Sequence, residues 1–239
     1  MPAGTNRACA ILPVIFNPMK NNYQTIDSKE VFDRIAPSWY NFRHRSIFRR
    51  ELEALAQRWQ GGSLINIGCG HGPDFLPFTL NFDLTGIDFS QQMLNLAVKY
   101  CRKFGFAAKL LLADARQLPF ADSVFDQAIA VASYHHIPKG KEQLAAFEEL
   151  RRVLKPGGEA FITVWNHWQP RFWRHGREIT VPWRTGEVTL ERYYYLFSYP
   201  ELSRLARKAG FKVLRTYPES SYSFPIKLFS RNICLLVRK

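Results

Sequence analysis

The sequence lacks any run of 18 or more apolar residues, the length that a membrane-spanning helix needs, so we expect no membrane association. Cysteine is also scarce. The four cysteines, Cys9, Cys69, Cys101 and Cys234, are far apart and form no Cys-x-x-Cys pair. This spacing argues against a structural zinc site and gives no disulfide framework, which is typical of a cytoplasmic protein with reduced thiols.

Acidic residues are few relative to basic ones. The chain has 20 Asp and Glu against 33 Lys and Arg, which gives a net charge of +13. Residues 43–58 contain five arginines, and residues 165–177 mix arginines with tryptophan and phenylalanine. Basic side chains among aromatic ones suit a phosphate backbone and unstacked bases. A solvated basic surface remains the alternative, since net charge does not determine fold.

The order of the hydrophobic patterns predicts an α/β fold. Residues 1–28 have no clear period and are expected to form a flexible extension, followed by a single domain over 29–239. Residues 29–59 have a helical pattern with an expected break at Ala36-Pro37, because proline disfavours helix in the residue before it. Strand and helix patterns then alternate, which predicts a mostly parallel Rossmann-like sheet with helices on both faces.

The last part of the chain departs from this alternation. Residues 166–197 form an insertion rich in Trp, Tyr and Arg. A helix is expected over 200–209, and strands over 211–216 and 232–237. Two closing strands joined by a loop predict a hairpin at the edge of the sheet.

A glycine turn follows the first predicted strand, at Gly68, Gly70 and Gly72. Glycine allows a strand to turn sharply while its backbone approaches a ligand closely. Asp88 ends the next strand, and a carboxylate there can accept hydrogen bonds from both hydroxyls of a ribose. Asp114 ends the third strand and can accept an adenine amino hydrogen. Taken alone, the glycine turn also fits a nicotinamide-dependent oxidoreductase.

Five sequence blocks occur in a fixed order: IGCGHG at 67–72, GIDFS at 86–90, DA at 114–115 with LPF at 118–120, HHI at 135–137, and RRVLKPGG at 151–158. Together they resemble the class I S-adenosylmethionine-dependent methyltransferases of the type 11 superfamily. The resemblance implies a seven-stranded sheet whose last strand is antiparallel, with S-adenosyl-L-methionine as cofactor.

The same resemblance implies a set of cofactor contacts: Asn66, Gly68, Cys69, Gly70, Gly72, Asp88, Phe89, Asp114, Ala115 and Ala132. Two positions depart from the pattern. Asn66 stands where these enzymes usually have an acidic residue, so the methionine end of the cofactor meets no charge there. His71 stands where the related tRNA enzymes commonly have asparagine.

The flanks are similar to a narrower family, the tRNA methyltransferases that form the methyl ester of 5-carboxymethyluridine at the wobble position. The matching stretches are VFDRIAP at 31–37, FRH at 42–44, VW at 164–165, VPW at 181–183 and RYYYLF at 192–197. This similarity implies tRNA as the substrate. A carboxylate acceptor is already ionised near neutral pH, so its methylation needs positioning and exclusion of water more than a strong base.

The match also implies catalytic candidates. Arginine holds a carboxylate through two parallel hydrogen bonds, and Arg43 is the first candidate for this role, with Arg192 as the second. One of His135 and His136 is expected to line the acceptor side and the other to pack in the core. Trp165 and Tyr193 are expected to form the pocket wall or to stack on the base.

Two further expectations concern ligands and partners. Adjacent histidines without a cluster of Cys, Asp or Glu supply too few ligands for a metal ion, and none is expected. Members of this family often work with a small zinc-binding activator subunit, which would add at the exposed edge near residues 107–112.

Two other functions remain open at this point. One is a small-molecule O-, N- or C-methyltransferase, because the same core serves both kinds of substrate. The other is an RNA-binding protein with a decayed methyltransferase site, which only the neutral Asn66 suggests.

Overall fold

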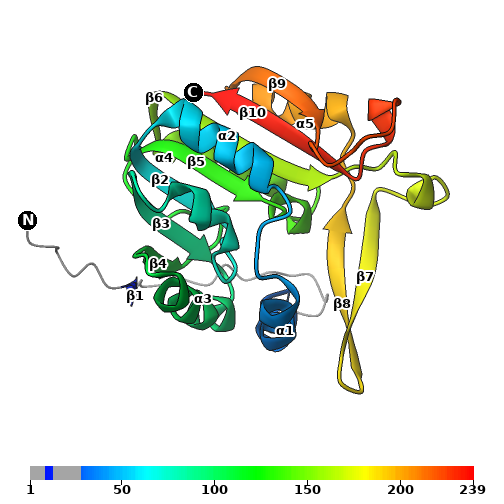
Figure 1. Ribbon diagram of the computed structural model, residues 1–239. Coiled ribbons are helices and arrows are strands. Elements are labelled where there is room, and N and C mark those ends of the chain that lie inside the picture. The colour runs from blue at the N-terminus through cyan, green and yellow to red at the C-terminus, as the bar shows by residue number, and fades with distance from the viewer. Residues whose placement is uncertain (1–8, 13–27) are drawn as a thin grey trace, which may run out of the picture.

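The computed structural model describes residues 9–12 and 28–239. Their centre is an eight-stranded sheet in the order β1-β4-β3-β2-β5-β6-β10-β9 (Figure 1). The strands, in that order, are Ala10–Leu12, Lys109–Leu112, Phe82–Asp88, Gly62–Ile67, Phe125–Val131, Leu154–Trp165, Asn232–Arg238 and Lys212–Pro218. The first six are parallel to one another, and β10 is antiparallel to both β6 and β9. The predicted fold class and the closing hairpin are therefore confirmed.

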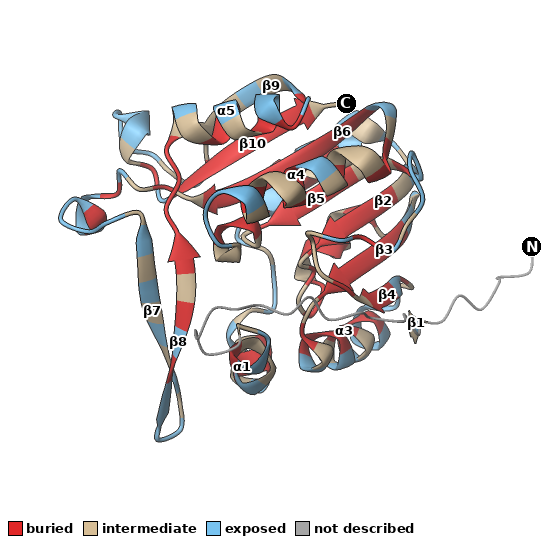
Figure 2. Ribbon diagram, turned by 180° about the vertical axis from the view of Figure 1, so that it is seen from behind, coloured by how far each residue is buried: buried red, intermediate tan, exposed pale blue. Residues whose placement is uncertain are grey.

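Helices cover both faces of this sheet. On one face lie α2 (Arg49–Trp59), α3 (Gln91–Phe104) and the 3-10 helix η1 (Pro73–Phe78), and on the other lie α4 (Lys141–Val153) and α5 (Tyr199–Lys208). Leu64 and Ile65 of β2 are both fully buried, yet they belong to different hydrophobic clusters. Strands covered on both faces are apolar at consecutive positions, and Figure 2 shows the central strands buried along their length.

The first helix, α1 (Ser28–Phe42), runs through Pro37, so the predicted break at Ala36-Pro37 is wrong. The helical pattern breaks instead at residues 43–48, between α1 and α2. Ile35 and Ala36 are fully buried in a cluster with Met93 and Leu190. This tertiary packing stabilises the helix across the proline, whose missing N–H removes only one backbone hydrogen bond.

Residues Ala10–Leu12 form β1, although the sequence places them in a flexible extension. They pair in parallel with β4, from Ala10 opposite Lys109 to Leu12 opposite Leu111. This pairing adds the eighth strand and covers the β4 edge that was expected to be exposed. The Sγ atom of Cys9 lies 2.7 Å from that of Cys101 on α3, which places the segment against the helix. The rest of the predicted extension, residues 1–8 and 13–27, lies outside the described residues.

The Trp-, Tyr- and Arg-rich insertion begins with the short helix η3 (Pro170–Phe172) and continues as an antiparallel pair, β7 (Glu178–Thr185) and β8 (Val188–Tyr195). This hairpin projects from the sheet and lies beside α1 (Figure 1). Two other short helices, η2 (Tyr134–His136) and η4 (Lys227–Phe229), lie in the loops that follow β5 and β9. The hairpin, α1 and the carboxyl ends of the parallel strands surround one pocket.

Candidate active site

The floor of the pocket is the glycine turn after β2. The amides of Gly68 and Cys69 both donate to the carbonyl of Ile87, at 2.9 Å, which ties the turn to β3. Gly68 has φ +72°, and a Cβ there would lie 2.4 Å from Cβ of Ser133. Gly70 has φ +53°, but nothing lies within 4 Å of the position of its Cβ. Gly68 therefore permits close packing, whereas Gly70 leaves the backbone open on the side of a ligand.

Asp88 closes one side of this floor at the end of β3. Its Oδ2 accepts a hydrogen bond from the amide of Gly70 at 2.8 Å, and its Oδ1 accepts one from the amide of Ser90 at 2.9 Å. Burial raises the pKa of the carboxyl to about 6. The carboxylate is thus fixed against the glycine turn, as a ribose-binding group requires.

Of the predicted cofactor residues, six line the pocket: Gly68, Cys69, Gly70, Asp88, Phe89 and Ala132. Asn66, Gly72, Asp114 and Ala115 are not among the lining residues. The carboxylate of Asp114 forms an ion pair with Arg116, with 2.5 Å between Nη2 and Oδ2, so its predicted contact with adenine stays a prediction.

Asn66 is fully buried, and neither polar atom of its amide has a hydrogen-bond partner in the described part of the chain. Buried polar groups normally have partners, so this orphaned amide beside the glycine turn is consistent with a ligand or water there. The open space at Gly70 and the fixed carboxylate of Asp88 also fit a nucleoside cofactor. Gly70 and Asp88 would hold the nucleoside part of S-adenosylmethionine.

Two arginines line the opposite side of the pocket, Arg43 from the loop after α1 and Arg192 from β8. Neither guanidinium forms an ion pair with a carboxylate within residues 9–12 and 28–239. The Nε atom of each is buried and has no described hydrogen-bond partner. Burial lowers the pKa of both guanidiniums. The charge of Arg192 lowers that of Arg43 further, and the nearby Asp74 and Tyr194 oppose this shift only in part. Two desolvated cations in one pocket are complementary to an anionic ligand.

An aromatic wall adjoins these arginines. The ring of Tyr194 stacks on Trp165, at 4.2 Å between centroids, and on His135 at 4.8 Å. Its hydroxyl accepts a hydrogen bond from Nη1 of Arg192 at 2.9 Å. The rings and the guanidinium therefore hold one another in place and present a flat surface beside the cations.

Both predicted histidines line the pocket, so the structure does not separate a lining histidine from a core one. Nδ1 of His135 accepts a hydrogen bond from the amide of Trp165, and Nδ1 of His136 donates one to the carbonyl of Tyr193. Burial lowers the pKa of His136 to about 4 and that of His135 well below its usual value. Both imidazoles are neutral at neutral pH.

Tyr193 does not reach the pocket lining; its hydroxyl donates to Glu178 at 3.0 Å. Side chains alternate along a strand, so Arg192 and Tyr193 point to opposite faces of β8 and Tyr194 takes the position beside Arg192. The period of two could have identified Tyr194 from the sequence. The indole of Trp183 and the ring of Phe32, which also line the pocket, come from the hairpin and α1 and carry no comparable local signal.

A hydrogen bond links the two sides of the pocket. Nε2 of His71, in the glycine turn, donates to the carbonyl of Arg43 at 2.5 Å. The hydroxyl of Tyr100 donates to the next carbonyl, that of His44, at 2.6 Å. Burial lowers the pKa of His71 to about 4, so this ring is neutral and its other nitrogen has no described partner. The loop that carries Arg43 is therefore held by the cofactor side of the pocket.

The described residues contain no group of three or more His, Cys, Asp or Glu side chains that could hold a metal ion. None of their helices is both long enough and apolar enough to cross a membrane.

Comparisons with known proteins agree with this geometry. Residues 64–158 match a methyltransferase domain family. A protein of Encephalitozoon cuniculi with a methyltransferase name is 30% identical over 191 residues, which are 77% of this chain and 85% of that protein. The tRNA (carboxymethyluridine(34)-5-O)-methyltransferase ALKBH8 of mouse is 33% identical over 136 residues, which are 57% of this chain but only 19% of that protein.

Solved structures share the fold. The CcbJ methyltransferase from Streptomyces caelestis has a TM-score of 0.71 at 16% identity, over 89% of this chain and 99% of that one. At this identity the likeness concerns the fold alone. With the sequence matches, the glycine turn and Asp88, the chain belongs to the class I S-adenosylmethionine-dependent methyltransferase family.

Proposed function

We propose that this protein methylates the carboxylate of 5-carboxymethyluridine, or of a closely related wobble uridine, in cytoplasmic tRNA. The observation that carries the proposal is a pair of guanidiniums, of half-buried Arg43 and buried Arg192, that face one pocket without an ion-pair partner among the described residues. An acceptor carboxylate would supply that partner. Relatives in mouse and Arabidopsis thaliana are named as tRNA (carboxymethyluridine(34)-5-O)-methyltransferases, which supports the same substrate.

The glycine turn and the two arginines would have different roles in the reaction. Gly70 and Asp88 would hold the nucleoside part of the cofactor, and the predicted contacts from Phe89, Ala132, Gly72, Asp114 and Ala115 remain part of this proposal. S-adenosylmethionine, when bound, supplies a methyl group on a sulfonium. Arg43 and Arg192 would align the carboxylate by paired hydrogen bonds, and the wall of Trp165 and Tyr194 would support the uracil ring.

The neutral histidines fit this chemistry. An ionised carboxylate has no proton to lose before it is methylated, so the acceptor side needs no protein base. His135 and His136 would instead shape an apolar surface that excludes water around the reacting oxygen. Asn66 would offer the cofactor a neutral polar contact where related enzymes have a charge.

A zinc-binding activator subunit remains a prediction without a site. Its expected position, the edge of β4, is paired with β1 of the same chain. If such a subunit acts on this protein, β1 must leave that edge or the subunit must bind elsewhere.

The test is mass spectrometry of tRNA nucleosides. Purified protein and S-adenosylmethionine are incubated with bulk tRNA from cells that lack the gene, and Asp88→Ala serves as the control. We expect a gain of one methyl on a carboxymethylated uridine with the wild type alone. Binding of S-adenosylhomocysteine with an unchanged nucleoside profile would favour a small-molecule substrate, and failure to bind it would favour the decayed site.

A further inference from the structure

A basic and aromatic surface beside the pocket is not used by the proposed reaction. It is built from two segments that lie far apart in sequence, residues 167–175 and 220–231. Its exposed basic side chains are Arg171, Arg174, Lys227 and Arg231, and its exposed apolar ones are Trp168, Trp173, Phe224, Ile226 and Leu228. We call this the rim surface. Neither segment contains an acidic residue.

The two segments are fixed to each other. Nδ2 of Asn166, the residue before the first segment, donates to the carbonyls of Leu228 at 2.7 Å and Ser230 at 2.8 Å. The indole of Trp173 donates to the carbonyl of Trp168 at 3.0 Å and meets the ring of Phe229 edge-on at 5.5 Å. Because these contacts hold the exposed ring of Trp173 in place, this side chain has little freedom left to lose on binding.

The charges of the rim surface are free to bind a ligand. None of its four basic side chains forms an ion pair with a carboxylate of the described residues. Glu219, which precedes the second segment, is 4% exposed and accepts hydrogen bonds from the amides of Arg231 and Asn232. Its carboxylate is thus committed to the backbone. A surface of unpaired cations attracts a polyanion.

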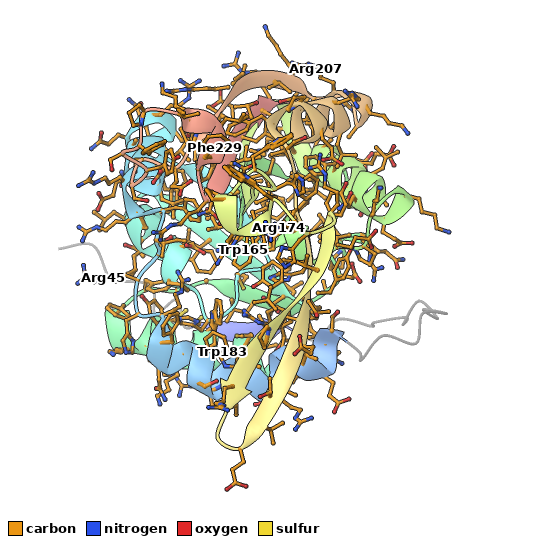
Figure 3. All side chains as sticks on the ribbon, turned by 90° about the vertical axis from the view of Figure 1, so that its right-hand side faces the viewer. Arg45, Trp165, Arg174, Trp183, Arg207 and Phe229 are labelled. Carbon is orange, nitrogen blue, oxygen red and sulfur yellow. The ribbon has the colours of Figure 1, made fainter. Side chains whose placement is uncertain are left out.

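The rim surface adjoins the pocket. The guanidinium of Arg171 lies 4.7 Å from the ring centroid of Trp165, and Trp165 lines the pocket. Figure 3 shows Trp165, Arg174 and Phe229 on the same side of the molecule, whereas Arg207 lies on α5 at the top. A chain whose target nucleotide enters the pocket would pass over this surface.

We propose that the rim surface binds the single-stranded RNA nucleotides next to the methylated one, with Trp173 stacking on a base and Arg174 contacting phosphate. This inference rests on the proposed function, because it needs an RNA substrate. Aromatic rings can stack only on bases that are unpaired, so the surface fits a loop better than a duplex. Its dense positive charge favours RNA over a protein partner, whose docking surfaces are depleted of charge at their centre.

The test measures binding of a fluorescein-labelled anticodon stem-loop by anisotropy, with the full-length protein and S-adenosylhomocysteine. Trp173→Ala and Arg174→Glu are compared with two controls away from the surface. Arg207→Glu makes the same charge change on α5, and Leu80→Ala removes another exposed apolar side chain, 94% exposed. Calorimetry with S-adenosylhomocysteine verifies that each variant keeps a folded cofactor site.

Loss of one stacking contact should weaken binding by about 5- to 150-fold for Trp173→Ala. Arg174→Glu should weaken it by about tenfold and lower the slope of log affinity against log salt by about 0.7 or more. Both controls should remain within about twofold of the wild type. Duplex RNA of equal length should lose little affinity from Trp173→Ala.

Three results would overturn the inference. Equal losses for Arg174→Glu and Arg207→Glu would indicate unspecific attraction to net charge. Unchanged affinity and unchanged tRNA methylation in both rim variants would refute the surface but leave the proposed function intact. A wild type that binds S-adenosylhomocysteine but neither binds nor methylates RNA would overturn both proposals.

Discussion

Replacing Arg192 by methionine should lower activity without lowering stability. The side chain is 6% exposed, its Nε has no described hydrogen-bond partner, and burial lowers the pKa of the guanidinium. A buried and unpaired cation opposes folding, and methionine fills similar space without charge. The substitution loses the hydrogen bond to Tyr194 and the contact with the ring of Trp183, whose centroid lies 4.9 Å away, together about 1–2 kcal/mol.

The two effects on stability oppose each other, so the free energy of unfolding should stay within about 1 kcal/mol of the wild type or rise. The effect on catalysis has no such compensation. A hydrogen bond to a charged group contributes about 1.5–3 kcal/mol, so kcat/KM for tRNA should fall by about 10- to 150-fold. Arg192→Lys keeps the charge but not the planar pair of donors, so its kcat/KM should lie between those of the wild type and Arg192→Met.

Urea unfolding followed by tryptophan fluorescence measures the first quantity, and transfer of labelled methyl to tRNA measures the second. Arg43→Met is the matched variant at the other arginine of the pocket. If the arginines hold the same carboxylate, the losses in the double variant should not add. A loss of more than about 2 kcal/mol in stability with activity intact would show that Arg192 is structural, and the reasoning would be refuted.

Three further predictions test the cofactor side. Because the pKa of Asp88 is about 6, the affinity for S-adenosylhomocysteine measured by calorimetry should fall by up to about tenfold per pH unit below pH 6, and Asp88→Asn should abolish this dependence. In urea unfolding, Gly68→Ala should destabilise the protein by about 3 kcal/mol or more and Gly70→Ala by about 1 kcal/mol. Both variants strain a residue with positive φ, but only Gly68→Ala adds a steric clash, so equal losses would contradict this reasoning. His71 has a folded pKa of about 4 against 6.5 unfolded, so the unfolded state binds more protons between these values. The free energy of unfolding should therefore fall as the pH falls through this window, by up to about 1.4 kcal/mol per pH unit. His71→Asn should remove this part of the pH dependence, and superimposable stability curves of variant and wild type would count against it.

The parallel sheet and the glycine turn could be predicted because their signals are local. Strands buried on both faces are continuous apolar runs, and serine is a favoured N-cap residue, as Ser90 is for α3, where its Oγ accepts from the amide of Met93 at 3.1 Å. The carboxyl ends of parallel strands meet at one edge, so Gly68 and Asp88 could be brought together without a structure.

Features that depend on distant partners could not be predicted in this way. Strand β1 has three residues and becomes a strand only because β4 offers an edge to it. Trp183 lines the pocket because its hairpin lies on α1, where the indole donates to Oγ of Ser38 at 2.8 Å across 145 positions. No local period encodes such a contact, so the sequence does not identify Trp183 as a pocket residue.

Long-range packing also accounts for His71, which stands where the related tRNA enzymes commonly have asparagine. An asparagine side chain is shorter than an imidazole, whereas His71 reaches the carbonyl of Arg43 from the glycine turn. The helix before this loop, α1, is held through Asp33, which accepts hydrogen bonds from Oγ of Ser90 and the amide of Gln92. His71 and Ser90 both lie within two residues of groups of the proposed cofactor site, Gly70 and Asp88. The backbone at Arg43 is thus fixed to the glycine turn, and a shift of this turn on cofactor binding would move Arg43 through the hydrogen bond from His71.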